Sequence, residues 1–106
     1  MNTQRFMISL KFSQQHRPEI FALLPQEQAR AEELRMQGVI EVIYLSADNT
    51  VGWLIAHGAS QAHVQEALAS LPLYSHGYME ANLTLLSQVD SHRDSNSELL
   101  LPKQSM

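Results

Sequence analysis

Strict alternation of apolar and polar side chains near both ends of the chain constrains the fold more than any other feature. In residues 4 to 12, every second position contributes to one apolar face, made of Phe6, Ile8, Leu10 and Phe12. Residues 77 to 86 alternate in the same way, with one face made of Gly77, Met79, Ala81, Leu83 and Leu85 and the other of Tyr78, Glu80, Asn82 and Thr84. A period of two is typical of a β-strand with one buried face. Both stretches are therefore predicted to be strands.

Two more strands are predicted in the middle of the chain. Residues 39 to 45 (VIEVIYL) are apolar on both faces except at Glu41, so something is expected to cover each face. Residues 51 to 57 (VGWLIAH) place Trp53 and His57 on one face. The turn residues between the two runs have the length of a hairpin loop.

The first predicted helix runs up to Gln37. Pro18 suits its first turn, residues 26 to 37 are rich in helix formers, and Gly38 is a natural stop. Pro25 either starts a new helix or kinks one that began near Pro18.

A second helix is predicted at residues 61 to 70, with Ser60 as its N-cap and Pro72 as its end. A loop with adaptable polar groups then follows, Tyr74-Ser75-His76-Gly77. Such loops between regular elements are common places for small-molecule sites.

The order β-α-β-β-α-β predicts a ferredoxin-like α+β fold, in which an antiparallel sheet carries two helices on one face. The uncovered face is expected to carry Met7, Ile43 or Tyr44, Trp53 or Leu54, and Tyr78. An aromatic-rich open face is usually an interface. We therefore expect a homodimer in which two sheets pack into an α+β barrel. The sequence does not decide whether such dimers assemble into a higher oligomer.

Length and composition narrow the class of protein. At 106 residues a single domain is expected, over residues 1–88, followed by a polar tail over 89–106. The apolar patch Leu99–Leu101 in that tail either docks on a partner or is disordered. A net charge of −4 argues against a nucleic-acid partner, and the lack of cysteine excludes disulfides and thiolate chemistry. No apolar run reaches the roughly 18 residues of a membrane span, so a soluble cytoplasmic protein is expected.

Glu27 is the main candidate for catalysis. It shares a helix stripe with Leu24, Ala31, Leu34 and Gly38. Burial on this stripe would raise the pKa of its carboxyl, as suits a general base. The alternative is that Glu27 is exposed, because Pro25 leaves the local phase of the helix open.

Tyr44 and His57 are the other catalytic candidates, as a hydrogen-bond donor to an oxyanion and as a proton shuttle. Trp53, Tyr74, His76 and Tyr78 are candidates for substrate binding. For each aromatic residue, packing in the core, a loop or an interface is the alternative interpretation; for His57 it is an exposed strand end. The histidines at positions 57, 63 and 76 lack a metal-binding spacing, so no metal site is predicted.

Three features together resemble the muconolactone isomerase family over residues 5 to 86. They are Leu71-Pro72-Leu73-Tyr74 followed by Tyr78-Met79-Glu80, a helix carboxylate at Glu27 eleven residues before Gly38, and the spacing from Gly38 through the hairpin to Ser60. Two positions depart from the family pattern. Val42 stands where the family has a histidine, and Leu45 where it has a basic residue.

The resemblance implies a dimeric α+β barrel that can assemble into decamers. It also implies a cofactor-independent isomerase of aromatic catabolism that shifts a proton within a small unsaturated lactone or related acid, with Glu27 as base and Tyr44 or His57 assisting. The departures at Val42 and Leu45 favour an alternative, a non-catalytic ligand-binding or assembly module of the same fold. A second alternative is a cofactor-free monooxygenase of the related barrels, in which Trp53 and Asn82 would take part.

Overall fold

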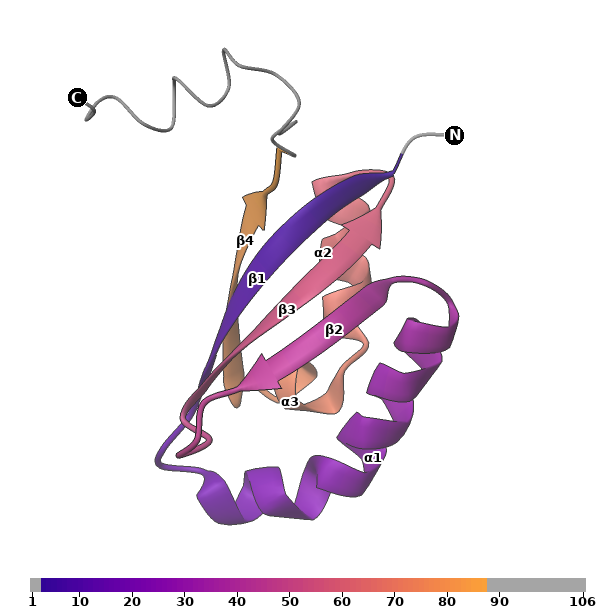
Figure 1. Cartoon of the computed structure of the whole chain (residues 1–106). Coiled ribbons are helices and arrows are strands. Elements are labelled where there is room, and N and C mark those ends of the chain that lie inside the picture. The colour runs from indigo at the N-terminus through magenta and orange to yellow at the C-terminus, as the bar shows by residue number, and fades with distance from the viewer. Residues whose placement is uncertain (1–2, 88–106) are drawn as a thin grey trace, which may run out of the picture.

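A four-stranded antiparallel sheet with its helices on one side forms the protein, as a computed structural model of residues 3–87 shows (Figure 1). The strands are β1 (Gln4–Phe12), β2 (Ile40–Leu45), β3 (Val51–Gly58) and β4 (Met79–Leu85), in the sheet order β2-β3-β1-β4. The helices are α1 (Arg17–Met36), α2 (Gln61–Ala69) and α3 (Pro72–Ser75). The predicted ferredoxin-like α+β fold is confirmed. The tail predicted for residues 89 to 106, with its Leu99–Leu101 patch, lies outside the described residues.

The core lies between the sheet and the helices. The strand register places apolar side chains on this face of the sheet. Phe6, Ile8 and Leu10 of β1 pair with alternate residues of β3 and β4, whose side chains point to the same face. The buried residues are Phe6, Ile8, Leu10, Leu34, Ile40, Leu54, Ala56, Val64, Leu68, Leu71, Leu73 and Met79. In α1, which contacts α3 and β2, Leu34 is the buried residue. The rest of this long helix is at the surface or half-buried.

Three details differ from or refine the sequence predictions. Pro72 does not only follow α2; it opens the short helix α3, in a stretch expected to be a loop. Tyr78 is not part of β4, because its N–H still donates to the carbonyl of Leu73 in α3, at 2.9 Å. It was therefore wrongly placed on the open face of the sheet. Pro25 lies inside one continuous helix, and α1 bends near its middle (Figure 1).

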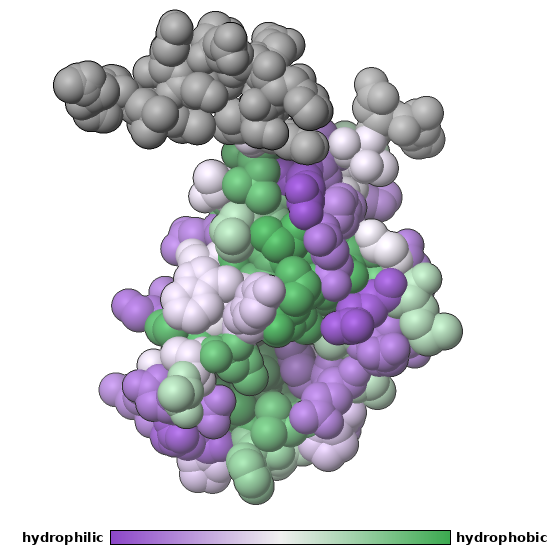
Figure 2. All heavy atoms as spheres, viewed as in Figure 1, coloured by the Kyte–Doolittle hydropathy of each residue, from purple (hydrophilic) through white to green (hydrophobic). Residues whose placement is uncertain are grey.

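The opposite face of the sheet is left uncovered by the helices. Met7, Tyr44 and Trp53 lie on it with 37%, 61% and 41% of their surface exposed. Tyr44 and Trp53 are paired across β2 and β3, and Val42 and Ile55, two positions along, are the next pair on the same face. Figure 2 views this face, and apolar atoms occupy its centre. Within residues 3–87, no helix is long and apolar enough to cross a membrane.

Gly58 marks the closest approach of β3 to α2. A Cβ atom added there would lie 2.6 Å from Cγ2 of Val64, which is fully buried and stiff. We expect Gly58→Ala to lower the free energy of unfolding by about 1–3 kcal/mol through overpacking. Adding Val64→Ala should restore part of this loss, because the second change removes the clashing methyl groups. Urea unfolding at fixed protein concentration measures both effects, and an unchanged midpoint for Gly58→Ala would contradict this account.

Candidate functional site

A cleft of about 340 Å³ lies between the first half of α1, the end of β1, the β2–β3 hairpin and α3. We call it the α1 cleft. Its apolar walls are Phe12, Ile20, Phe21, Leu24, Leu45 and Leu73. Its polar groups are Ser13, Gln14, Arg17, Gln28 and Asn49. Apolar walls with a few placed polar groups are typical of sites for small organic molecules.

Helical spacing and hairpin geometry build this cleft. Its α1 residues recur every three or four positions, so they form one stripe: Arg17, Ile20, Phe21, Leu24 and Gln28. Asn49 faces them from the hairpin in a left-handed conformation with φ of 61°, which Asn tolerates better than most residues. Asp48 fixes the loop, because its Oδ1 accepts hydrogen bonds from Ser46 and Thr50.

Glu27 does not line the α1 cleft itself; it lies next to two residues that do, Gln28 in sequence and Leu73 through a hydrogen bond. Its carboxylate is half-buried, and its Oε1 accepts a hydrogen bond from the N–H of Leu73 at 2.9 Å. Burial raises the pKa of this carboxyl above its ordinary value of 4.5, and the Leu73 hydrogen bond opposes that shift in part. Glu27 thus lies on the partly covered side of α1, as its helical spacing indicated, and its pKa shift has the direction that burial gives. The hydrogen bond that holds α3 was not foreseen.

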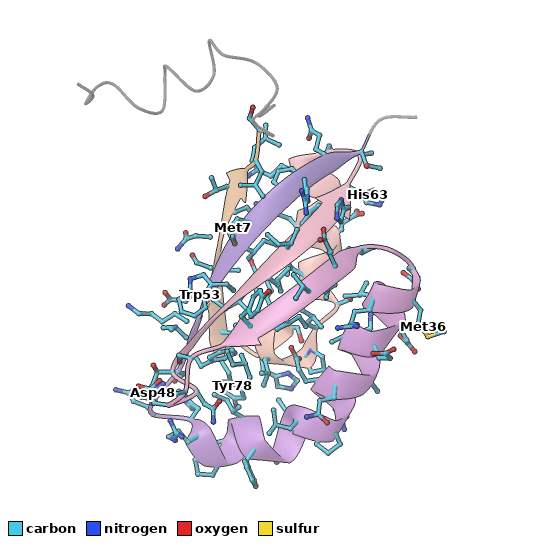
Figure 3. All side chains as sticks on the ribbon, in the orientation of Figure 1. Met7, Met36, Asp48, Trp53, His63 and Tyr78 are labelled. Atoms are coloured by element: carbon cyan, nitrogen blue, oxygen red, sulfur yellow. The ribbon has the colours of Figure 1, made fainter. Side chains whose placement is uncertain are left out.

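Tyr74, His76 and Tyr78 lie in or just after α3, and each has different surroundings. Tyr74 is exposed on the helix. The ring of Tyr78 stacks between His76, at 5.8 Å between centroids, and His16, at 4.9 Å. Figure 3 shows Tyr78 between the sheet and α1 rather than on the open face. His76 Nδ1 lies 2.8 Å from the carbonyl oxygen of Pro72, so it closes the end of α3.

Tyr44, Trp53 and His57 belong to the open face, on the other side of the sheet from Glu27. His57 does not line the α1 cleft. Its Nε2 lies 2.8 Å from Oε1 of Glu41, and the guanidinium of Arg5 donates to the same carboxylate at 3.0 to 3.3 Å. His57 and Arg5 hold the pKa of the Glu41 carboxyl below its ordinary value. Within one chain, the sheet therefore lies between Glu27 and the side chains of Tyr44 and His57, and the assisting roles predicted for these two residues stay predictions.

Two further sequence predictions can be placed on this geometry. Trp53 and Asn82 pair with the same β1 residue, Ser9, from β3 and β4, so they lie in one row across the open face. Val42 lies on the open face as well, whereas Leu45 lines the α1 cleft. In the part of the chain that the structure describes, no group of three His, Cys, Asp or Glu side chains could hold a metal ion.

Sequence reasoning missed His16 and Arg17. The helix was predicted to begin near Pro18, yet α1 begins at Arg17 and His16 is its N-cap residue. His16 stacks on Tyr78 and its Nδ1 lies 2.8 Å from Oγ of Ser13, and Arg17 lines the α1 cleft. The available signal was Pro18 itself, because proline at the first or second helical position puts the residues just before it at the helix end.

Comparison with known proteins bears on most of this chain. The family model described as muconolactone delta-isomerase matches residues 5–92, which include every described strand and helix from Arg5 onward. The comparison with curated proteins gave no match.

The half-buried carboxyl of Glu27 gives a testable pH dependence of stability. Because its pKa is raised in the folded state, the protonated form favours folding. Its contribution is fully present below 4.5 and is lost as pH rises through the folded pKa. Glu27→Gln keeps an acceptor for the Leu73 N–H but cannot ionise. We therefore expect this variant to gain stability relative to the wild type as pH rises through that window.

Glu27→Ala serves as the comparison variant, since it removes the acceptor as well. It should be less stable than Glu27→Gln by about 1–3 kcal/mol, because the Leu73 N–H loses its partner. Denaturant unfolding between pH 3 and 8 measures all three chains. A difference between wild type and Glu27→Gln that is the same at every pH would contradict the role of burial.

Proposed function

The chain belongs to the muconolactone delta-isomerase family, and from this premise we propose that it is a cofactor-independent isomerase. The proposed reaction shifts a proton, and with it a carbon–carbon double bond, within a small unsaturated lactone or a related acid. The single observation that carries the proposal is the half-buried carboxylate of Glu27, with its raised pKa, beside the mostly apolar α1 cleft.

The chemistry needs a base, an acid and stabilisation of the intermediate. The Glu27 carboxylate would take a proton from a carbon activated by the lactone, which leaves an extended enolate. The resulting carboxylic acid would return the proton at the far end of the enolate, so the double bond moves and atoms and charge balance. The amide side chains of Gln28 and Asn49 line the cleft and are our candidates for hydrogen bonds to the enolate oxygen.

The raised pKa supports this role for Glu27. A carboxylate with a raised pKa is a stronger base when ionised and a competent acid when protonated. An apolar surrounding also strengthens any hydrogen bond to the enolate, because water competes less. Leu24 and Leu73 supply such surroundings next to Glu27.

One observation favours a second candidate, a ligand-binding module without catalysis. The hydrogen bond from Leu73 gives Glu27 a structural task, because it satisfies an amide at the start of α3. A carboxylate kept for that task needs no reaction. The two candidates make opposite predictions for Glu27→Gln, which preserves the hydrogen bond and removes the base.

If Glu27 is the base, Glu27→Gln should lower kcat for muconolactone isomerisation by about 10²–10⁴-fold with the fold intact. In wild type, kcat/KM should rise with pH as Glu27 ionises, at a pH above its ordinary pKa of 4.5. Exchange of substrate carbon-bound hydrogen with D₂O, followed by NMR, detects the proton step directly. Full activity and exchange in Glu27→Gln would contradict catalysis by Glu27, while binding without exchange in wild type would favour the second candidate.

We also propose that the open face of the sheet is the homodimer interface. Met7, Tyr44 and Trp53 make it apolar, and the ionic cluster Arg5–Glu41–His57 lies at its edge. An apolar centre with a polar rim is the usual anatomy of protein interfaces. Such a dimer would also bury area that a chain of this size cannot bury alone.

Trp53→Glu should then convert the protein to a monomer, because it puts a charge in the centre of the interface without touching the core. Met36→Glu is the matched control, since Met36 is 80% exposed and lies at the far end of α1 (Figure 3). Light scattering after size-exclusion chromatography gives the mass of each variant. An unchanged mass for Trp53→Glu, with the circular dichroism of wild type, would exclude this face.

A further inference from the structure

We propose that Arg17 is the residue that binds the carboxylate of a small acid in the α1 cleft. This inference rests on the proposed function for the location of the site and for the class of ligand, and it adds the residue that would hold the ligand's carboxylate. It assigns a role to a residue that neither the proton shift nor the dimer uses.

Within residues 3–87, no carboxylate neutralises the charge of Arg17. Among the arginines that the structure describes, Arg5, Arg30 and Arg35 each lie within 4 Å of a carboxylate, at 3.0, 2.7 and 3.7 Å. Arg17 has no such partner among residues 3–87. Glu19 shares the first turn of α1, but it does not line the cleft.

A fixed neutral group holds the Arg17 side chain in place. Nη1 of Arg17 donates to Oε1 of Gln14 at 2.7 Å, and Nε2 of Gln14 donates in turn to the carbonyl of Phe12 at 2.9 Å. The amide orients the guanidinium without cancelling its charge. Because a guanidinium has five N–H donors in a planar fork, the others can still bind a carboxylate through two parallel hydrogen bonds.

The surroundings of Arg17 suit an anion with an apolar body. Arg17 lies at the N-terminus of a long helix, whose dipole adds positive potential. The walls beyond it on the same helix stripe are apolar, at Ile20, Phe21 and Leu24. A ligand held by its carboxylate at Arg17 would therefore lie along α1 toward Leu24 and Gln28, and Glu27 is next to Gln28.

The spacing along α1 allows one molecule to meet both charged groups. Arg17 and Glu27 are ten residues apart, which is about 15 Å along a straight helix and less along the bent one. The long Arg17 side chain and a lactone with a carboxymethyl arm can together span that distance. The carboxylate would then be far from Glu27, so the base and the anion of the ligand would not repel each other strongly.

Binding, measured separately from turnover, tests Arg17. Isothermal titration calorimetry in the Glu27→Gln background would compare muconolactone with its methyl ester, which lacks the anion. Arg17→Gln should weaken binding of the acid by about 10-fold or more, as expected for the loss of a charge-assisted pair, and leave the ester within about 2-fold. Arg17→Lys should give an intermediate value, since it keeps the charge without the fork.

Arg35→Gln is the control, because it removes the same charge from an exposed position at the other end of α1. It should change neither affinity by more than about 2-fold. Equal weakening by Arg17→Gln and Arg35→Gln, equal weakening of acid and ester, or no binding of the acid would each overturn the proposal. Turnover of muconolactone by Glu27→Gln would instead contradict the proposed function. The effect of Arg17→Gln on binding would then be measured as a change in KM, in the protein that keeps Glu27.

Discussion

The hydrogen bond from the Leu73 N–H to Glu27 joins the two parts of the helical layer that the site needs. Leu73 is buried in the core, and α3 has only one turn, so it cannot hold its own geometry. Glu27 supplies the missing acceptor from α1 at 2.9 Å. The other side of Leu73 is fixed as well, because its carbonyl accepts from Tyr78, whose own carbonyl accepts from Ser13 at the end of β1. The α1 cleft exists because this relay ties α1, α3 and β1 together.

Partial burial beside this relay lowers the stability of Glu27 in its ionised form. A neutral amide at this half-buried position would lose less hydration energy than a carboxylate does. The raised pKa of Glu27 reflects this desolvation penalty. A Gln at this position could accept the Leu73 bond without ionising, so the carboxylate lowers stability where an amide would not. For this reason the Glu27→Gln variant separates structure from reactivity more cleanly than the alanine variant does.

The period-two pattern of the strands predicted most of the fold and the face on which Trp53 lies, because each strand alternates into one covered and one open side. Irregular strand pairing and turns interrupt this alternation, so the alternation could not predict them. Irregular pairing between Ile40 and Val42 puts Glu41 beside His57 and Arg5 on the open face. Tyr78 was predicted to lie within a strand over residues 77 to 86, but the turn at Gly77, with φ of 79°, keeps it bonded to α3.

Of the candidate site, the sequence predicted only the residue whose surroundings follow from its local helical spacing. Glu27 was found because helical spacing alone placed it beside Leu24 and Ala31. Arg17 was missed because its role depends on the bend of α1 and on an amide three residues earlier, neither of which has a sequence period. The separation of Tyr44 and His57 from Glu27 follows from the sheet itself. Alternation gives the sheet one open face and one face covered by helices, so within a single chain a side chain on the open face cannot reach the covered one.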